Sequence, residues 1–195
     1  YQAAAKQLIP VTLELGGKSP AIVTPSCDVK LSAKRLVWGK FLNAGQTCVA
    51  PDYVMVHESI RVLFLKACTA EIEKAQYCSG SHNYCQIIND RHWDRLVKLL
   101  DPDKVFYGGT IDQQKRFIQP TIMTGVTFDD PVMQEEIFGP LLPVMGYQNL
   151  DDALASIKAL EKPLAAYIFS SRKDEVRKIL SDLSFGGGAV NDVVM

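Results

Sequence analysis

Short apolar runs alternate along this sequence with longer segments in which apolar residues recur at a helical period. Each run is bounded by glycine, proline or small polar residues, which is typical of strands. We expect strands at residues 11–15, 21–23, 53–56, 105–107, 117–123 (interrupted by Pro120), 141–147, 165–169 and 187–190. The alternation of strand and helix favours an α/β layered domain with a mostly parallel sheet flanked by helices.

The intervening segments predict helices with recognisable starts. Leu31 to about Asn43 carries the helical period, and Asp28 precedes it as an N-cap residue. Other helices are predicted to start at caps Ser59, Asp90 and Asp151, to cover 174–183, and to form a short turn over 131–136.

Composition narrows the class of protein. The 195 residues are 47% hydrophobic and 22% charged, with a net charge of -1. This balance fits one globular domain and gives no overall field to attract nucleic acid or anionic lipid. No apolar run approaches the ~20 residues of a membrane span, and no secretory signal is expected. Because the sequence starts at Tyr1 and stops shortly after a glycine-rich run, we expect a piece of a longer protein.

The five cysteines favour an intracellular, cytoplasmic location. Their number is odd and no CxxC pair occurs, which predicts reduced thiols rather than a disulfide framework. The three histidines show no metal-ligand spacing with the cysteines, so we expect no metal site.

Two glycine motifs resemble phosphate-binding loops but miss a required position. Gly17-Lys18-Ser19 matches the end of a P-loop, yet Thr12 stands where that loop needs glycine. The glycines at 186–188 would need a small residue at 191, which is Asn191. Neither segment is expected to bind phosphate.

The candidate chemistry lies at Cys48 and Glu14. Cys48 follows the first long predicted helix in a short loop, and Glu14 stands 34 residues upstream, before Gly16-Gly17. A thiol nucleophile and a carboxylate base form a plausible pair for covalent catalysis. The residues alone leave other interpretations open, because free cysteine is usually a small core residue and most glutamates are solvated. The spacing does not establish a contact.

Three motifs resemble one family. Residues 11–20 (VTLELGGKSP) are similar to the glutamate signature of the aldehyde dehydrogenase superfamily, and residues 38–53 (WGKFLNAGQTCVAPDY) to its cysteine signature. Residues 134–140 (QEEIFGP) resemble its cofactor-contacting stretch, and the likeness extends to Asn191-Asp192. The sequence around the cysteine, residues 46–53 (QTCVAPDY), is most similar to the class 3 branch of the superfamily, which includes fatty-aldehyde enzymes.

The resemblance implies a role for each matching residue. Cys48 would attack the aldehyde carbon, its backbone N–H would form half of an oxyanion hole, and the resulting thiohemiacetal would be oxidised to a thioester. Glu14 would be the general base for thioester hydrolysis. Glu136 would bind ribose hydroxyls of NAD or NADP, and Phe138 would pack beside the nicotinamide. Without the resemblance, the segment 136–138 would be interpreted as a helix end with a buried aromatic.

The resemblance also implies what surrounds this segment. Residues 1–195 would form the catalytic domain, without the N-terminal dinucleotide-binding domain and the C-terminal end, so the chain alone is expected to be inactive. The expected partners are a small aldehyde (medium or long aliphatic, or aromatic) and a second copy in a homodimer, with no nucleic acid. Membrane contact is expected only if an anchor follows at the C-terminus.

Two rival functions remain from the sequence. One is a cysteine hydrolase or esterase with His57 as the base, which requires the two side chains to lie within hydrogen-bond reach. The other is a non-catalytic module that kept the fold, against which the presence of Cys48, Glu14, Glu136 and Phe138 argues.

Overall fold

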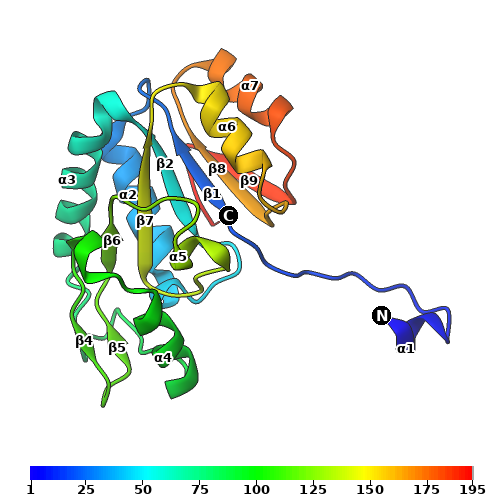
Figure 1. Cartoon of the computed structure of the whole chain (residues 1–195), viewed down its shortest axis with the longest axis horizontal. Helices are drawn as coiled ribbons and strands as arrows, with labels where there is room; N and C mark the ends of the chain where they lie inside the picture. Colours follow the sequence, from blue (N-terminus) through cyan, green and yellow to red (C-terminus); the bar gives the residue numbers. More distant parts are fainter. Residues whose placement is uncertain (195) are drawn as a thin grey trace.

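Seven strands form one sheet in the computed structural model, which describes residues 1–194 (Figure 1). All neighbouring strands are parallel except β3 and β6, which confirms the mostly parallel sheet. The spatial order is β3 (Val105–Tyr107), β6 (Thr121–Met123), β7 (Leu141–Tyr147), β2 (Tyr53–His57), β1 (Pro20–Val23), β8 (Ala165–Phe169) and β9 (Gly187–Val190).

Helices cover both faces of the sheet. Figure 1 shows α2 and α3 on one side and α6 and α7 on the other. The helices are α1 (Gln2–Ala5), α2 (Val29–Phe41), α3 (Glu58–Ala75), α4 (Asp90–Leu99), α5 (Pro131–Gln134), α6 (Leu150–Lys158) and α7 (Lys173–Asp182), with 3-10 turns η1 (Leu42–Gly45) and η2 (Pro102–Lys104). Within residues 1–194, no helix has the length and apolar character needed to cross a bilayer.

The central strands are buried on both faces. Every residue of β1 and β8 is buried, and β2 is buried up to its last residue. Strands enclosed between two helical layers have continuous apolar sequences rather than alternating ones. This is why the short runs at 21–23, 53–56 and 165–169 predicted their strands correctly.

The strand predicted at residues 11–15 is wrong. This stretch belongs to an arm that leaves the body and ends in α1, as Figure 1 shows. Leu13 and Leu15 are 57% and 85% exposed. A strand needs a neighbouring strand to satisfy its backbone groups, and no strand within residues 1–194 pairs with the arm. The turn expected after it does occur, since Gly16 and Gly17 have φ of 71° and 127°.

The strand predicted at 117–123 is two strands in different sheets. β5 (Phe117–Ile118) forms a hairpin with β4 (Ile111–Asp112), whereas β6 joins the main sheet. Pro120 separates them because it has no N–H to continue a ladder.

Three predicted helix caps are displaced by one or two residues. Ser59, Asp90 and Asp151 lie inside their helices rather than at the cap. The side chains that accept the first-turn N–H groups come earlier: His57, Asn89 and Asn149. Asp28 does cap α2, accepting from Leu31 N at 3.0 Å. Asparagine is as good an N-cap residue as aspartate or serine, so at Asn89 and Asn149 the sequence has two candidate helix starts close together.

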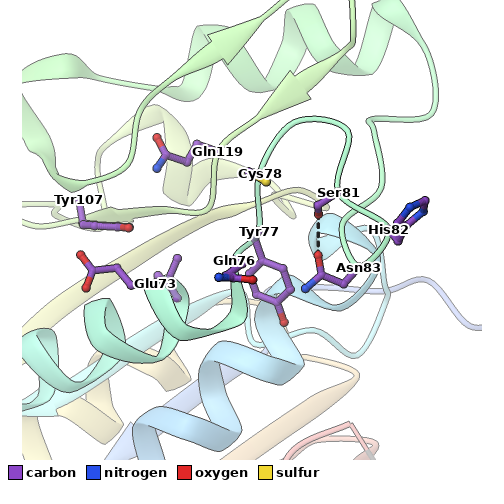
Figure 2. Close-up of a pocket in the computed structure, with 10 residues that line it drawn as sticks. Glu73, Gln76, Tyr77, Cys78, Ser81, His82, Asn83, Tyr107 and Gln119 are labelled. Atoms are coloured by element: carbon purple, nitrogen blue, oxygen red, sulfur yellow. Dashed lines mark hydrogen bonds between the residues drawn. The ribbon is translucent and has the colours of Figure 1, made fainter.

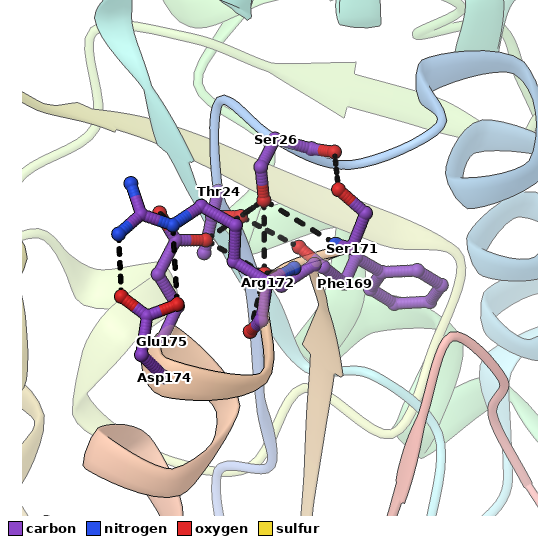
Figure 3. Close-up of polar contacts among 8 residues, drawn as sticks. Thr24, Ser26, Phe169, Ser171, Arg172, Asp174 and Glu175 are labelled. Carbon is purple, nitrogen blue, oxygen red and sulfur yellow. Dashed lines mark hydrogen bonds and ion pairs between the residues drawn. The ribbon is translucent and has the colours of Figure 1, made fainter.

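A polar network ties together the carboxyl ends of β1 and β8 (Figure 3). Ser26 and Ser170 each donate a hydroxyl hydrogen bond to Glu175 Oε2, at 2.8 and 2.6 Å. Thr24 N donates to Phe169 O at 3.0 Å. The donors and acceptors of this network therefore satisfy one another's hydrogen-bonding capacity. The motifs with candidate chemistry precede the strands and therefore lie at the opposite, amino edge of the sheet.

Candidate active site

The amino ends of three neighbouring parallel strands meet at one edge of the sheet. β1 follows the glutamate motif, β2 follows the cysteine motif, and β7 follows the 134–140 motif. The backbones there are in close contact. A Cβ added at Gly17 would lie 3.3 Å from Cα of Pro163, and one added at Gly45 would collide with the carbonyl of Gly139. The fold thus brings three distant motifs together.

An unusual backbone turn presents Cys48. Asn43, Ala44 and Gly45 all adopt left-handed φ, at 52°, 52° and 74°. Left-handed backbone is costly for residues with a Cβ and often marks a functional loop. Cys48 follows this turn and is half-buried. Burial, and then the nearby Cys48, raises the pKa of Tyr167, whose hydroxyl donates to Val49 O.

The outer side of the cysteine loop is braced by a segment that sequence reasoning did not connect with it. Gln46 Oε1 accepts from Ile88 N at 2.9 Å, and Gln46 Nε2 donates to Gln86 O at 3.3 Å. The Cys85 thiol donates to Asn43 Oδ1 at 3.3 Å. These contacts hold the loop from the side of α4.

Glu14 lies on the arm and is exposed. Its Oε1 accepts a hydrogen bond from Gly16 N at 2.6 Å. No hydrogen bond joins Glu14 to Cys48 among the described residues. Its charge does reach the other carboxylate of the candidate site, because it contributes to the raised pKa of Glu136.

Glu136 and Phe138 follow α5 and face this edge. A Cβ at Gly16 would lie 2.5 Å from Glu136 Oε2, so the glycine leaves room for the carboxylate. Burial and then Asp52 raise the pKa of Glu136, while a backbone hydrogen bond from Gly17 and the charge of Lys18 oppose the shift. Phe138 is 39% exposed and has φ of 47°, so its ring does not supply core.

A buried ion pair, which the sequence did not reveal, joins the three motifs. Lys18 Nζ lies 2.5 Å from Asp52 Oδ2, and also donates to Val132 O at 3.0 Å and Glu135 O at 2.9 Å. Asp52 Oδ1 accepts from Ile137 N at 3.0 Å. Both charges lie within the recognised motifs, but sequence spacing alone gives no sign that they meet.

Arg95 of α4 holds the same segment from the other side. It donates to Glu135 Oε1 at 3.0 Å, Glu136 O at 3.3 Å and Ile137 O at 2.5 Å. The backbone on either side of Glu136 is therefore fixed by two cations, Lys18 and Arg95.

His57 does not lie with Cys48. It ends β2, whereas Cys48 precedes that strand, and five strand residues span roughly 16 Å. Its Nδ1 lies 2.8 Å from Ser59 Oγ, and its Nε2 lies 3.1 Å from Gln148 O. The geometry does not form the cysteine–histidine pair that a hydrolase requires.

A cavity of about 690 Å³ lies at the end of α3 (Figure 2). Its lining includes Glu73, Tyr77, Cys78 and Tyr107, and none of the four predicted site residues. We therefore place the candidate active site at the amino edge of the sheet and not in this cavity.

Comparison with known proteins decides the family. The family model described as "Aldehyde dehydrogenase family" matches residues 1–195. The chain belongs to the aldehyde dehydrogenase family. This agrees with the resemblance drawn from the three motifs, and the fold is that of solved aldehyde dehydrogenases.

Individual relatives give the same assignment. The chain is 46% identical to 4,4'-diaponeurosporen-aldehyde dehydrogenase of Staphylococcus aureus, over 100% of the chain and 43% of that protein. It is 47% identical to the mouse protein named "Aldehyde dehydrogenase, dimeric NADP-preferring", over 99% of the chain and 43% of that protein. The structure of substrate-bound Staphylococcus aureus AldH superposes with a TM-score of 0.96 at 45% identity, covering 100% of this chain and 43% of that one. The chain thus spans about two fifths of the length of these relatives.

Proposed function

We propose that this chain is the catalytic-domain part of an NAD(P)-dependent aldehyde dehydrogenase of the class 3 type, which oxidises aldehydes to carboxylic acids. The observation that carries the proposal is the Lys18–Asp52 pair with its contacts to Val132, Glu135 and Ile137. This pair brings the motifs of Glu14, Cys48 and Glu136 to one edge of the sheet. Family membership then supports a role for each.

Cys48 is the nucleophile. Its thiolate attacks the aldehyde carbon and forms a carbon–sulfur bond, giving a thiohemiacetal whose oxygen the Cys48 backbone N–H stabilises. An ordinary thiol is only ~3% ionised at neutral pH, so the site must assist deprotonation. Cys48 is half-buried and follows the left-handed turn.

Glu14 is the general base. After oxidation, the substrate is held on Cys48 as a thioester, and a water molecule must lose a proton to attack it. Glu14 lies between α1 and β1 in a part of the arm without regular structure, and within residues 1–194 its carboxylate accepts a hydrogen bond from Gly16 N alone.

Residues at the same edge fit part of a nicotinamide dinucleotide. Glu136 is a half-buried carboxylate that can accept hydrogen bonds from two neighbouring hydroxyls, and Phe138 offers an exposed ring beside it. When bound, the nicotinamide supplies the hydride acceptor. Neither residue distinguishes NAD from NADP, since both lie on the proposed nicotinamide side.

The remainder of the dinucleotide site belongs to a domain outside residues 1–195. The chain spans about two fifths of its relatives, which supports its assignment as one domain of a longer enzyme. We infer that the chain alone has no useful dehydrogenase activity. Medium or long aliphatic and aromatic aldehydes are the proposed substrates, and the mouse relative with "dimeric" in its name supports a homodimer.

The experiment follows NAD(P)H formation by the full-length protein with hexanal, a long-chain aldehyde and benzaldehyde. Turnover that disappears in Cys48→Ser is the expected result. Absence of turnover in the wild type, with Cys48 still alkylated readily and esters cleaved without cofactor, would replace the proposal with a hydrolase.

A further inference from the structure

Lys40 is a lysine placed where lysines are rarely found. It lies in the last turn of α2, eight residues before Cys48, and its side chain is 0% exposed. Its Nζ has no hydrogen-bond partner within residues 1–194. A buried charge is normally paired, because leaving it alone in the interior is costly. Such a group requires an explanation.

The charges that act on Lys40 are those of the candidate site: Asp52, Lys18 and Glu136. Burial lowers its pKa to about 8 against the favourable charge of Asp52. Lys18 also lowers the pKa, and Glu136 raises it. Asp52 accepts from Lys18 Nζ at 2.5 Å and Ile137 N at 3.0 Å, and Lys40 Nζ has no hydrogen bond to either of its oxygens.

A protonated Lys40 adds its positive charge to those of Lys18 and Arg95 beside the segment that carries Glu136, and opposes the negative charges of Asp52 and Glu14. When Lys40 is neutral, this positive charge is lost, and Asp52 and Glu136 repel each other more strongly in a poorly solvated region. This repulsion would displace residues 135–138, because Lys18 and Asp52 hold that segment through Glu135 O and Ile137 N.

We propose that Lys40 is a positioning residue for cofactor binding: its buried ammonium balances Asp52 and Glu136 and keeps Glu136 in place for the ribose. The inference rests on the proposed function, and it adds a pH-dependent control of that same site. Deprotonation of Lys40 should loosen the 135–138 segment and weaken cofactor binding above about pH 8.

The test measures NADH and NADPH binding by fluorescence in the full-length protein between about pH 6 and pH 9.5. Every protein in this series, including the parent, also carries Cys48→Ser, so that ionisation of the Cys48 thiol does not contribute to the pH dependence of binding. We expect the dissociation constant to rise about five-fold through pH 8, the lower end of typical coupling between two sites. Lys40→Met should show the weaker binding at every pH, and Lys40→Arg should keep the tighter binding to the highest pH.

Two matched controls separate positioning from folding. Lys34→Met removes an exposed lysine from the same helix and should leave the profile unchanged. In Glu136→Gln, the added change Lys40→Met should have no further effect on binding. Thermal melts should show Lys40→Met at least as stable as the parent, because a buried ammonium without a hydrogen-bond partner has been removed.

The outcomes are distinct. A Lys40→Met profile that superposes on the parent, with tight binding retained, overturns the role of Lys40 and leaves the proposed function intact. A parent that binds neither NADH nor NADPH and oxidises no aldehyde overturns both.

Discussion

Lys18 and Asp52 form an ion pair of 2.5 Å in which the two side chains are only 9% and 4% exposed. The pair joins the glutamate motif to the cysteine motif, and its remaining hydrogen bonds reach the segment that carries Glu136. A single buried contact therefore ties together the three motifs that carry Glu14, Cys48 and Glu136.

Removing the Asp52 charge should destabilise the fold. Asp52→Asn keeps an acceptor for Ile137 N but removes the carboxylate that pairs with Lys18 and leaves Glu136 to balance both Lys18 and Lys40. Breaking a buried pair from one side typically costs about 3–5 kcal/mol. We expect a loss in this range by urea denaturation. Arg61→Ala, which breaks the partly exposed Arg61–Glu58 pair, is the control and should cost at most about 1 kcal/mol.

Stability should respond to pH through Lys40. Its folded pKa of about 8 lies below the ordinary value of 10.5, so the unfolded chain binds more protons between these values. The stabilising contribution of Lys40 is present above pH 10.5 and is lost as the pH falls through 8. The shift corresponds to about 3 kcal/mol, so Lys40→Met should be the more stable protein at pH 7 by roughly that amount. Melting curves at pH 7 and pH 10 with no change in this difference would contradict the prediction.

The turn before Cys48 should tolerate no side chain at Gly45. A Cβ there would collide with Gly139 O, and the φ of 74° is unfavourable for alanine. Gly80 has a similar φ of 80° with open space around it, so Gly80→Ala isolates the backbone effect of about 1 kcal/mol. Gly45→Ala should cost several times more and slow the alkylation of Cys48 by iodoacetamide. Equal stability and equal labelling rates in the two variants would refute the packing argument.

Cofactor binding should weaken in acid through Glu136. Its pKa is raised, chiefly by burial, so it becomes protonated at a higher pH than an ordinary glutamate. A protonated carboxyl offers the ribose fewer acceptor sites. NADH binding should therefore weaken in acid at a higher pH than an ordinary glutamate would give, whereas Glu136→Gln should bind more weakly with a flatter profile. If Glu136→Gln still lost NADH binding steeply at low pH, the titrating group would be a residue other than Glu136.

The parts of the fold that the sequence predicted are those set by local pattern. The strands at 21–23, 53–56 and 165–169 are enclosed on both faces, so their apolar runs were sufficient evidence. The stretch 11–15 carried a similar pattern without a pairing strand. The hydrophobic pattern of a segment shows that its side chains suit a strand, but it does not show whether a neighbouring strand is present to pair with it.

The candidate site divides in the same way. Cys48, Glu14, Glu136 and Phe138 were predicted from the motifs. The Lys18–Asp52 pair and the burial of Lys40 depend on how β1, β2 and α5 are packed together, and charged residues of this kind are normally exposed. Neither could be predicted from spacing.

Pre-steady-state formation of NAD(P)H in the full-length protein tests the central claim most directly. Cys48→Ser should form none. Glu14→Gln should give a burst close to one reduced cofactor per active site and then stall, because Cys48 retains the thioester that no base helps water to attack. Unimpaired steady turnover in either variant would contradict the assignment of Cys48 as nucleophile or of Glu14 as base.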